Sequence, residues 1–307
     1  MTITIKLTAS SSNKGVSFNS YMKSYFKDFS FEGWPYILGG SGEFKGSQIV
    51  LLDNMNGRNT KTIVVDGRSI AYDLAKHVVS GTATTIRLGT LGNSYKESGE
   101  FTEDSAGRIT KISAQVQISG LAIAGTEFHS LVSGLMGGVS SSRKANPAVL
   151  NAALADEAHN VAGSSASDTY TGTRFSDRIK GNAGNDQLTG GVGGDDIWGG
   201  AGSDTFIFKS VEDTTVKSSG RDTIFDFSVH QRDRIHLSSI DANALVGGNQ
   251  GFEFVGARAF SGRAGELQYN KGPSDTYISG DVNGDKVADF MIHLDDAIDV
   301  TQSYFVL

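Results

Sequence analysis

The stretch GNAGNDQLTGGVGGDDIWGGAGSDTFIF, residues Gly181–Phe208, repeats itself every nine residues. Two weaker copies precede it, and the whole array reads GSSASDTYT, GTRFSDRIK, GNAGNDQLT, GGVGGDDIW, GGAGSDTFI. An aspartate holds the sixth position of every unit: Asp168, Asp177, Asp186, Asp195 and Asp204. An apolar or aromatic residue follows two positions later: Tyr170, Ile179, Leu188, Ile197 and Phe206. This pattern predicts a calcium-binding parallel β-roll.

Each unit provides a glycine-rich turn and then a very short strand whose apolar residue points inward. Glycine lets the turn take positive φ and bring backbone carbonyls close to a cation, and aspartate supplies the hard oxygen that Ca²⁺ prefers. One turn offers only part of a coordination sphere, so we expect each ion to lie between turns two units apart. Besides the five aspartates, the expected ligand residues are Gly181, Ala183, Asn185, Gly190, Val192, Gly194, Gly199, Ala201 and Ser203.

Calcium is expected to be coupled to folding, because the carboxylates repel one another and the strands are too short to hold alone. The first two units lack glycine at the fourth position, so they are expected to be the weaker sites. A disordered Gly/Asp-rich linker is the alternative, which the strict spacing and the inward apolar residues disfavour.

Charge divides the 307-residue chain into two parts. Residues 1–160 carry 15 Lys and Arg against 13 Asp and Glu, whereas residues 161–307 carry 12 against 21. The acidic surplus argues against a nucleic-acid partner, and no run of eighteen apolar residues suggests membrane insertion. We predict two domains: an α+β domain over 1–160, with an antiparallel sheet and helices on one face, and an all-β domain over 161–307, a parallel β-roll with a C-terminal β-sandwich-like extension.

Helices in the first domain are expected where apolar residues recur at helical spacing. One begins near Phe18 and a second covers Glu127–Met136. A third begins at Asn146-Pro147 and runs to about His159. Strands are expected at Ser47–Asp53, Thr62–Gly67, Ser69–Leu74, Thr84–Leu91 and Ile112–Ile118.

The array resembles the RTX module of proteins exported by type I secretion, and later segments resemble the C-terminal domain of serralysin-type metalloproteases. These segments are DTIFDF (Asp222–Phe227), DRIHLSSIDA (Asp233–Ala242), GELQYN (Gly265–Asn270), GDVNGDKVADFMIHL (Gly280–Leu294) and the final VTQSYFVL, which resembles an uncleaved export signal. The resemblance implies a secreted, extracellular protein of a Gram-negative bacterium, with the type I (ABC) secretion apparatus as partner. Further candidate calcium ligands are Asp222, Asp281, Asn283, Asp285 and Asp289.

Motifs of the enzymes that carry such a tail are missing from the sequence. The six histidines form no H-E-x-x-H motif, and no G-x-S-x-G nucleophile elbow occurs. We therefore expect no enzymatic activity, and look to the first domain for the function.

The stretch VVDGRSIAYDLAKHVVSG (Val64–Gly81), with KGSQIVLLD before it and FHSLVSGLMGG after it, resembles the HasA-type haemophores. These secreted proteins take up haem and pass it to an outer-membrane receptor. The resemblance implies haem b as cofactor, haem or haem proteins as partners, and possible transfer to such a receptor. It assigns Tyr72 as the ligand of Fe³⁺ and His77 as the acceptor of the tyrosine's hydrogen bond, which favours the phenolate.

Family members often draw a second axial ligand from an early loop, but Phe31–Gly46 contains no histidine. We expect Trp34, Tyr36 and Leu38 to cover the haem face instead. His129 falls on the late helix, where a surface histidine is favoured over the alternative of a neighbour of the Tyr72/His77 pair. Two alternatives stay open. The first domain is a recognition module for another ligand or protein, or the chain is a structural adhesin, for which a single short roll gives little support.

Overall fold

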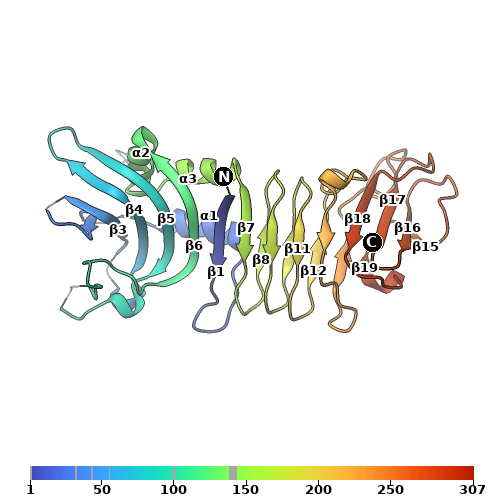
Figure 1. The fold of residues 1–307 in the computed structure, drawn as a ribbon, viewed down its shortest axis with the longest axis horizontal. Helices are drawn as coiled ribbons and strands as arrows, with labels where there is room; N and C mark the ends of the chain where they lie inside the picture. The colour runs from blue at the N-terminus through green and yellow to red at the C-terminus, as the bar shows by residue number, and fades with distance from the viewer. Residues whose placement is uncertain (1, 32, 43, 55, 99–100, 138–143) are drawn as a thin grey trace. The chain divides into compact units, whose positions relative to one another are not determined.

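The computed structural model describes residues 2–31, 33–42, 44–54, 56–98, 101–137 and 144–307. The protein is mostly β-sheet with few helices (Figure 1). The chain divides into two compact units: unit 1 comprises Met1–Thr8 and Asn19–Glu157, and unit 2 comprises Ala9–Phe18 and Ala158–Leu307. Across the described residues, none of the helices is both long enough and apolar enough to cross a membrane.

Unit 1 is built on an antiparallel sheet with the strand order β1-β6-β5-β4-β3-β2. Its strands are β1 Thr2–Leu7, β2 Tyr36–Leu38, β3 Lys45–Leu52, β4 Lys61–Asp73, β5 Val78–Thr90 and β6 Ser113–Ala124. The helices are α1 Phe18–Asp28, α2 Gly125–Leu135 and α3 Ala148–Ala155, with short 3-10 turns at Gly57–Asn59 and Gly92–Ser94. Helix α2 packs against β5 and β6, and α3 packs against α2.

The sheet of unit 1 buries apolar residues on both faces, since successive residues of a strand point to opposite sides. On the face of α2, the helix buries Phe128, Leu131, Val132 and Leu135. On the other face, the segment between β5 and β6 closes a second cluster, made of Val50, Leu52, Val64, Leu91, Phe101 and Ile109. The sequence pattern predicted only the helical side of this core.

Two expectations about unit 1 need correction. The strands expected at Thr62–Gly67 and Ser69–Leu74 are one strand, β4, because bulges after Asp66 and Arg68 absorb the irregular residues between them. The third helix ends at Ala155 rather than near His159. His159 lies in strand β7, where its backbone N–H donates to the carboxylate of Asp177, and an extended chain is needed to reach it.

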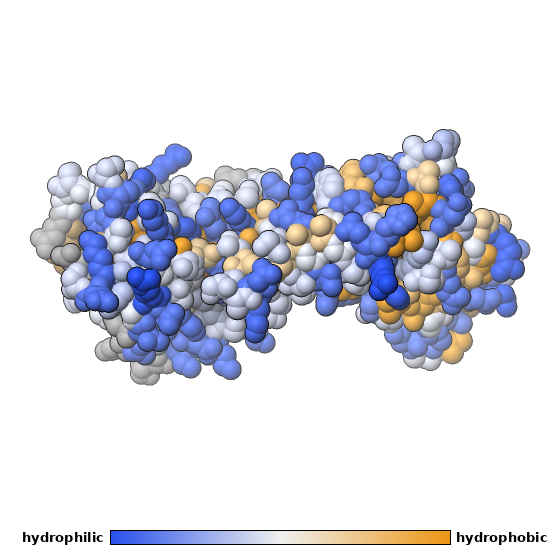
Figure 2. Space-filling view, turned by 90° about the horizontal axis from the view of Figure 1, so that it is seen from below, coloured by the Kyte–Doolittle hydropathy of each residue, from blue (hydrophilic) through white to orange (hydrophobic). Residues whose placement is uncertain are grey.

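Unit 2 contains a parallel β-roll made of two sheets, with the strand orders β7-β9-β11-β13-β18 and β8-β10-β12-β14-β19. The strands are β7 Ala158–Ala162, β8 Thr169–Thr171, β9 Arg178–Lys180, β10 Gln187–Thr189, β11 Asp196–Trp198, β12 Thr205–Ile207, β13 Thr223–Ile224, β14 Arg234–His236, β18 Phe290–Leu294 and β19 Phe305–Val306. The inward residues of the five repeats are at most 1% exposed. The face of the array seen in Figure 2 is mostly white and blue, as expected when the apolar residues point inward.

The C-terminal part continues the sheets of the roll. Strands β15 Glu253–Gly256, β16 Glu266–Lys271 and β17 Thr276–Asp281 extend one sheet beyond β18, and β19 ends the other. Two 3-10 turns lie at Ser218–Gly220 and Gln302–Tyr304. The residues expected to form a sandwich-like extension therefore lengthen the two sheets already present.

The segment Ala9–Phe18 belongs to unit 2, although the sequence placed it in the first domain. The backbone N–H of Val16 donates to Oδ1 of Asp168 at 2.5 Å, and the carbonyl of Val16 accepts from Thr169 N–H at 3.0 Å. Ser17 also forms a parallel bridge with Thr169. This segment covers the first turn of the roll, a long-range pairing that no local sequence pattern signals.

Candidate functional site

The aspartates of the repeats lie in two rows along the roll. In each row, the backbone N–H of one aspartate donates to Oδ1 of the next, at 2.7–3.0 Å. One row is Asp168, Asp186, Asp204 and Asp233, and the other is Asp177, Asp195 and Asp222. Neighbours within the repeat rows are eighteen residues apart. The stacking of turns two units apart is thus as expected.

Four of these carboxylates keep one buried oxygen without a hydrogen-bond partner among the described residues: Oδ2 of Asp186, Asp195, Asp204 and Asp222. Burial raises the pKa of the Asp186 and Asp195 carboxyls to about 7, and burial with the nearby Asp195 charge raises the pKa of Asp222 to about 9. A buried carboxylate without a partner is costly. A cation with a preference for hard oxygen ligands removes that cost, so the residues present fit Ca²⁺.

Glycine at the first position of the repeat is required by the space that the carboxylate occupies. A Cβ on Gly181 would lie 2.2 Å from Oδ2 of Asp186 and 2.5 Å from the carbonyl oxygen of Gly199. A Cβ on Gly190 would lie 2.1 Å from Oδ2 of Asp195. The unpartnered oxygens of Asp186 and Asp195 therefore face the glycine backbone of their own turns, where the sequence predicted carbonyl ligands.

The other predicted turn ligands lie along the same edges of the roll. Ala183 and Ala201 form a parallel bridge, and the amide oxygen of Asn185 accepts from Ser203 N–H at 2.9 Å. Gly194 N–H donates to the Ser176 hydroxyl, and Val192 is exposed. Their roles as calcium ligands stay predictions.

The first two turns differ from the others, because Ser164 and Thr173 stand at the second position of the repeat. Ser164 donates its N–H to Oδ2 of Asp168 at 2.5 Å and its hydroxyl to Oδ1 at 3.1 Å. Thr173 does the same for Asp177, at 2.6 and 3.1 Å. Both carboxylates are thus satisfied by protein donors, which gives the expected weakness of these two sites a physical cause.

Two further aspartates belong to this part of the roll and were missed by the sequence analysis. Asp233 ends one carboxylate row, and Asp226 accepts from the N–H groups of Gly199 and Gly200 at 2.8 and 2.9 Å. The signal for Asp233 was present, since Ile235 follows it two positions later, as in the repeats. Irregular spacing hid it.

The predicted calcium loop Asp281–Asp289 differs from the roll in its hydrogen bonding. Asp281 accepts from the backbone of Asn283, Gly284 and Lys286, and Asp289 accepts from Val282 N–H and from the Asn283 side chain. Asp285 accepts from Val287 N–H. This loop is closed by its own backbone donors and shows none of the unpartnered oxygens found in the roll.

In unit 1, Tyr72 near the end of β4 and His77 in the following turn lie together. The Tyr72 hydroxyl is 3.0 Å from Nδ1 of His77, the hydrogen bond that the resemblance implied. The turn is fixed by Asp73, whose Oδ1 accepts from the N–H groups of Ala75 and Lys76. The five-residue spacing is thus long enough for the chain to turn back and pair the two side chains.

Tyr72 lines an apolar hollow of about 400 Å³ on the face of the sheet that carries α2. The other lining residues are Trp34, Pro35, Ile37, Phe44, Ile49, Leu74, Val79, Val132 and Met136. His129 lies beside it, and its Nδ1 accepts from Val79 N–H at 3.2 Å. That nitrogen therefore helps to hold β5.

The expectation that Trp34, Tyr36 and Leu38 cover this hollow is only partly correct. Trp34 lines it, but Tyr36 and Leu38 belong to the opposite side of the sheet. Tyr36 contacts the ring of Phe101 at 4.9 Å between centroids, and Leu38 packs against the cluster that contains Phe101. Because residues of β2 alternate between faces, Ile37 reaches the hollow instead.

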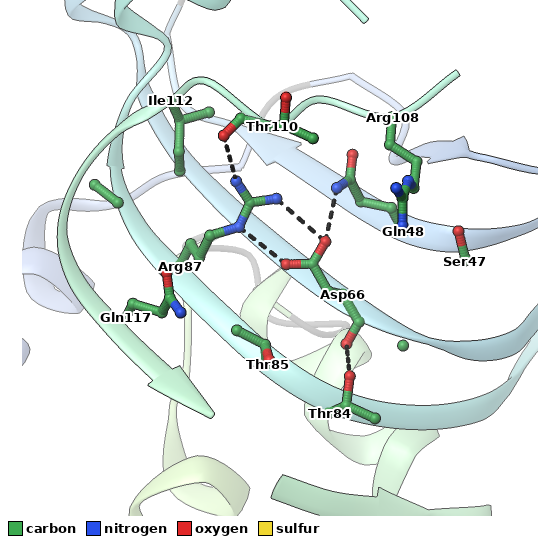
Figure 3. A pocket seen from close by; sticks show the side chains of 12 residues that line it. Ser47, Gln48, Asp66, Thr84, Thr85, Arg87, Arg108, Thr110, Ile112 and Gln117 are labelled. Carbon is green, nitrogen blue, oxygen red and sulfur yellow. Dashed lines mark hydrogen bonds and ion pairs between the residues drawn. The ribbon is translucent and has the colours of Figure 1, made fainter. Parts of the chain in front are cut away.

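A second hollow of about 500 Å³ lies on the face of the sheet away from α2 and is polar (Figure 3). Arg87 binds Asp66 through two nitrogens at 2.9 and 3.1 Å, and also donates to the carbonyls of Ile109 and Thr110. Gln48 pairs with the backbone of Ile109 and donates to Asp66. These contacts fix the segment before β6 onto the sheet, so the network has a structural role.

We expect Arg87→Ala to destabilise unit 1 by about 3 kcal/mol, because the Asp66 carboxylate loses its ion-pair partner. The segment before β6 also loses the hydrogen bonds that Arg87 donates to it. The Arg87 side chain is only 11% exposed. Thermal unfolding of the variant measures the loss. Lys76→Ala, which removes the exposed partner of Asp73, is the control and should leave the melting temperature unchanged.

The fold and the carboxylate rows define the class of nine-residue-repeat β-roll proteins. The sequence matches the model of the peptidase M10 serralysin C-terminal family over residues 122–306, and the chain belongs to this family. A comparison with curated protein sequences finds no match.

Among solved structures, the chain is similar to the AlgE6R3 subunit of the Azotobacter vinelandii mannuronan C5-epimerase, with 29% identity and a TM-score of 0.36 over 50% of this chain and 79% of that one. It is also similar to the holo hemophore HasA of Yersinia pestis, with 17% identity and a TM-score of 0.37 over 50% of this chain and 88% of that one.

Proposed function

We propose that this protein is a secreted, calcium-stabilised haem-binding protein that captures haem through Tyr72 for iron acquisition. The observation that carries the proposal is the Tyr72–His77 hydrogen bond at the wall of an apolar hollow. The sequence resemblance around Val64–Gly81 implies the same pair, with Tyr72 as the iron ligand and His77 as the acceptor of its hydrogen bond. Haem b supplies the ferric iron, and the proposal includes no catalytic step.

The residues around Tyr72 suit a large, flat, mainly apolar ligand. The hollow is lined almost wholly by aliphatic and aromatic side chains, which bury such a ligand without leaving polar groups unpaired. The exposed Trp34, at 71%, and Leu74, at 52%, stand at its edge, where a bound ligand would cover them. In this proposal Nδ1 of His77 accepts the hydrogen bond of the Tyr72 hydroxyl and holds its oxygen in place as the ligand of Fe³⁺.

The calcium roll supports the secretion part of the proposal. A chain whose β-roll needs calcium stays unfolded where calcium is scarce, which suits passage through a type I (ABC) apparatus, and folds outside the cell where calcium is plentiful. The C-terminal VTQSYFVL provides the export signal in this proposal, and an outer-membrane receptor receives the haem.

Titration with hemin tests the haem site. Tyr72→Phe removes the hydroxyl but keeps the ring, so it should abolish the shifted Soret band that the unchanged protein gives at micromolar concentration. Tyr36→Phe is the matched control, because Tyr36 lies on the other side of the sheet, and should bind hemin normally. If the unchanged protein gives no shift, haem is not its ligand and the recognition-module alternative is favoured.

A further inference from the structure

A cluster of three potential metal ligands lies in unit 2, apart from the carboxylate rows. His293 is on β18, Asp295 directly follows that strand, and Asp275 directly precedes β17. One ligand atom of each residue lies within 4.8 Å of the other two. We propose that these side chains form a binding site for a borderline divalent transition metal ion of the Zn²⁺ type.

The imidazole is held in the orientation that a metal ligand needs. Nδ1 of His293 is 3.1 Å from the Thr223 hydroxyl on β13, and Nε2 is 2.9 Å from Oδ1 of Asp275. The Tyr277 ring stacks on the imidazole, with centroids 4.9 Å apart and planes within 15°. When Nδ1–H donates to the hydroxyl, the lone pair of Nε2 points toward the carboxylates, an outer-shell arrangement common among metal-binding histidines.

Backbone hydrogen bonds to neighbouring strands place His293 and Asp295. The N–H groups of His293 and Asp295 donate to the carbonyls of Asp222 and Ile224, each at 3.0 Å. Tyr277 and His293 are directly paired across β17 and β18. Ligands fixed by strands lose little entropy when an ion binds, which favours a defined site on the surface.

The donor set separates this site from the calcium sites. One imidazole nitrogen and two carboxylate oxygens suit Zn²⁺, whereas Ca²⁺ prefers oxygen ligands alone and in larger number. Three protein ligands leave one position of a tetrahedral ion for water. His293 is 17% exposed, Asp275 is 32% exposed and Asp295 is exposed, so an ion can enter directly from solvent.

Calorimetric titration of ZnCl₂ into the 307-residue chain, held in excess calcium so that the roll stays folded, tests the proposal. We expect one Zn²⁺ ion whose affinity falls by more than about 100-fold in His293→Ala, beyond the 10–100-fold effects typical of outer-shell changes. Thr223→Val should weaken binding by about 10–100-fold. Replacing Zn²⁺ with Co²⁺ should give visible absorption that His293→Ala removes.

Matched variants keep the test independent of folding and of the haem site. Asp295→Asn should weaken Zn²⁺ binding, whereas Asp296→Asn, one residue further, should not. His230→Ala removes an exposed histidine elsewhere in unit 2 and should also leave it unchanged. The proposal is overturned if both His293→Ala and Asp295→Asn bind Zn²⁺ as well as the unchanged chain does, or if the unchanged chain binds none. The contact between His293 and Asp275 would then be only a hydrogen bond within the fold.

Discussion

In calcium-free buffer with excess EGTA, the β-roll of unit 2 is expected to unfold. Four buried carboxylate oxygens then lose their cation, and none of the described residues offers them a hydrogen bond in its place. Each site filled at 100 times its Kd adds about 2.7 kcal/mol to stability. Two such sites together match the lower end of the about 5–15 kcal/mol that holds a typical domain folded.

Tryptophan fluorescence can follow the roll separately from unit 1. The chain has two tryptophans, Trp34 in unit 1 and Trp198 on β11. Trp34 is 71% exposed, so Trp34→Phe should fold normally and leave Trp198 as the reporter. Trp198 stacks on Phe225, with centroids 4.3 Å apart, and its emission should shift toward that of a solvated indole when EGTA is added. An unchanged spectrum in EGTA would contradict calcium-coupled folding.

Substitutions at the two kinds of aspartate should separate calcium binding from simple packing. Asp195→Asn is expected to raise the calcium concentration needed for half-folding, because it weakens a site in which Oδ2 of Asp195 has no hydrogen-bond partner among the described residues. Asp168→Asn should lower the melting temperature without moving that midpoint, since Val16 and Ser164 already satisfy both oxygens of Asp168. Equal shifts of the calcium midpoint in both variants would contradict this distinction.

The β-roll could be predicted because its signals are local and regular. Each nine-residue unit carries its own turn, its carboxylate and its inward apolar residue, so the regular repetition of the unit predicts the stacked roll. Asp233 escaped prediction because its strand is not at the nine-residue spacing. The contact of Val16 with Asp168 joins residues 152 positions apart, and no periodic pattern records such a pairing.

The Tyr72 site, unlike the roll, could not be predicted from a local repeating pattern. The two residues are close in sequence, but their hydrogen bond depends on a turn set by Asp73, and only a family resemblance pointed to the pair. The side of the sheet reached by Tyr36 and Leu38 depends on strand register, which a short strand leaves undetermined. His293, Asp275 and Asp295 come together only through the pairing of β13, β17 and β18, so their sequence positions gave no signal.

Without calcium, the roll is expected to become more stable as the pH falls. The pKa of the Asp186 and Asp195 carboxyls in the folded chain is raised to about 7, and that of Asp222 to about 9, all above the value of about 3.9 for an unfolded aspartate. A raised pKa means that the folded state binds more protons than the unfolded state, so proton binding stabilises the fold fully at low pH. This stabilisation is lost as the pH rises from about 4 through 7 and, for Asp222, through 9. Calcium binding has the opposite dependence, since the ion requires ionised carboxylates.

Chelator-free protein, stripped of calcium by a resin, is the right material, because EGTA itself loses calcium affinity in acid. The emission of Trp198 in the Trp34→Phe chain should report a larger folded fraction of the roll at pH 5 than at pH 8. The double variant Asp186→Asn/Asp195→Asn carries amides that resemble protonated carboxyls, and its folded fraction should vary less between the two pH values. If the stability of the calcium-free roll instead rises with pH, these carboxylates are not buried in the folded roll. The physical argument for calcium-dependent folding would then fail.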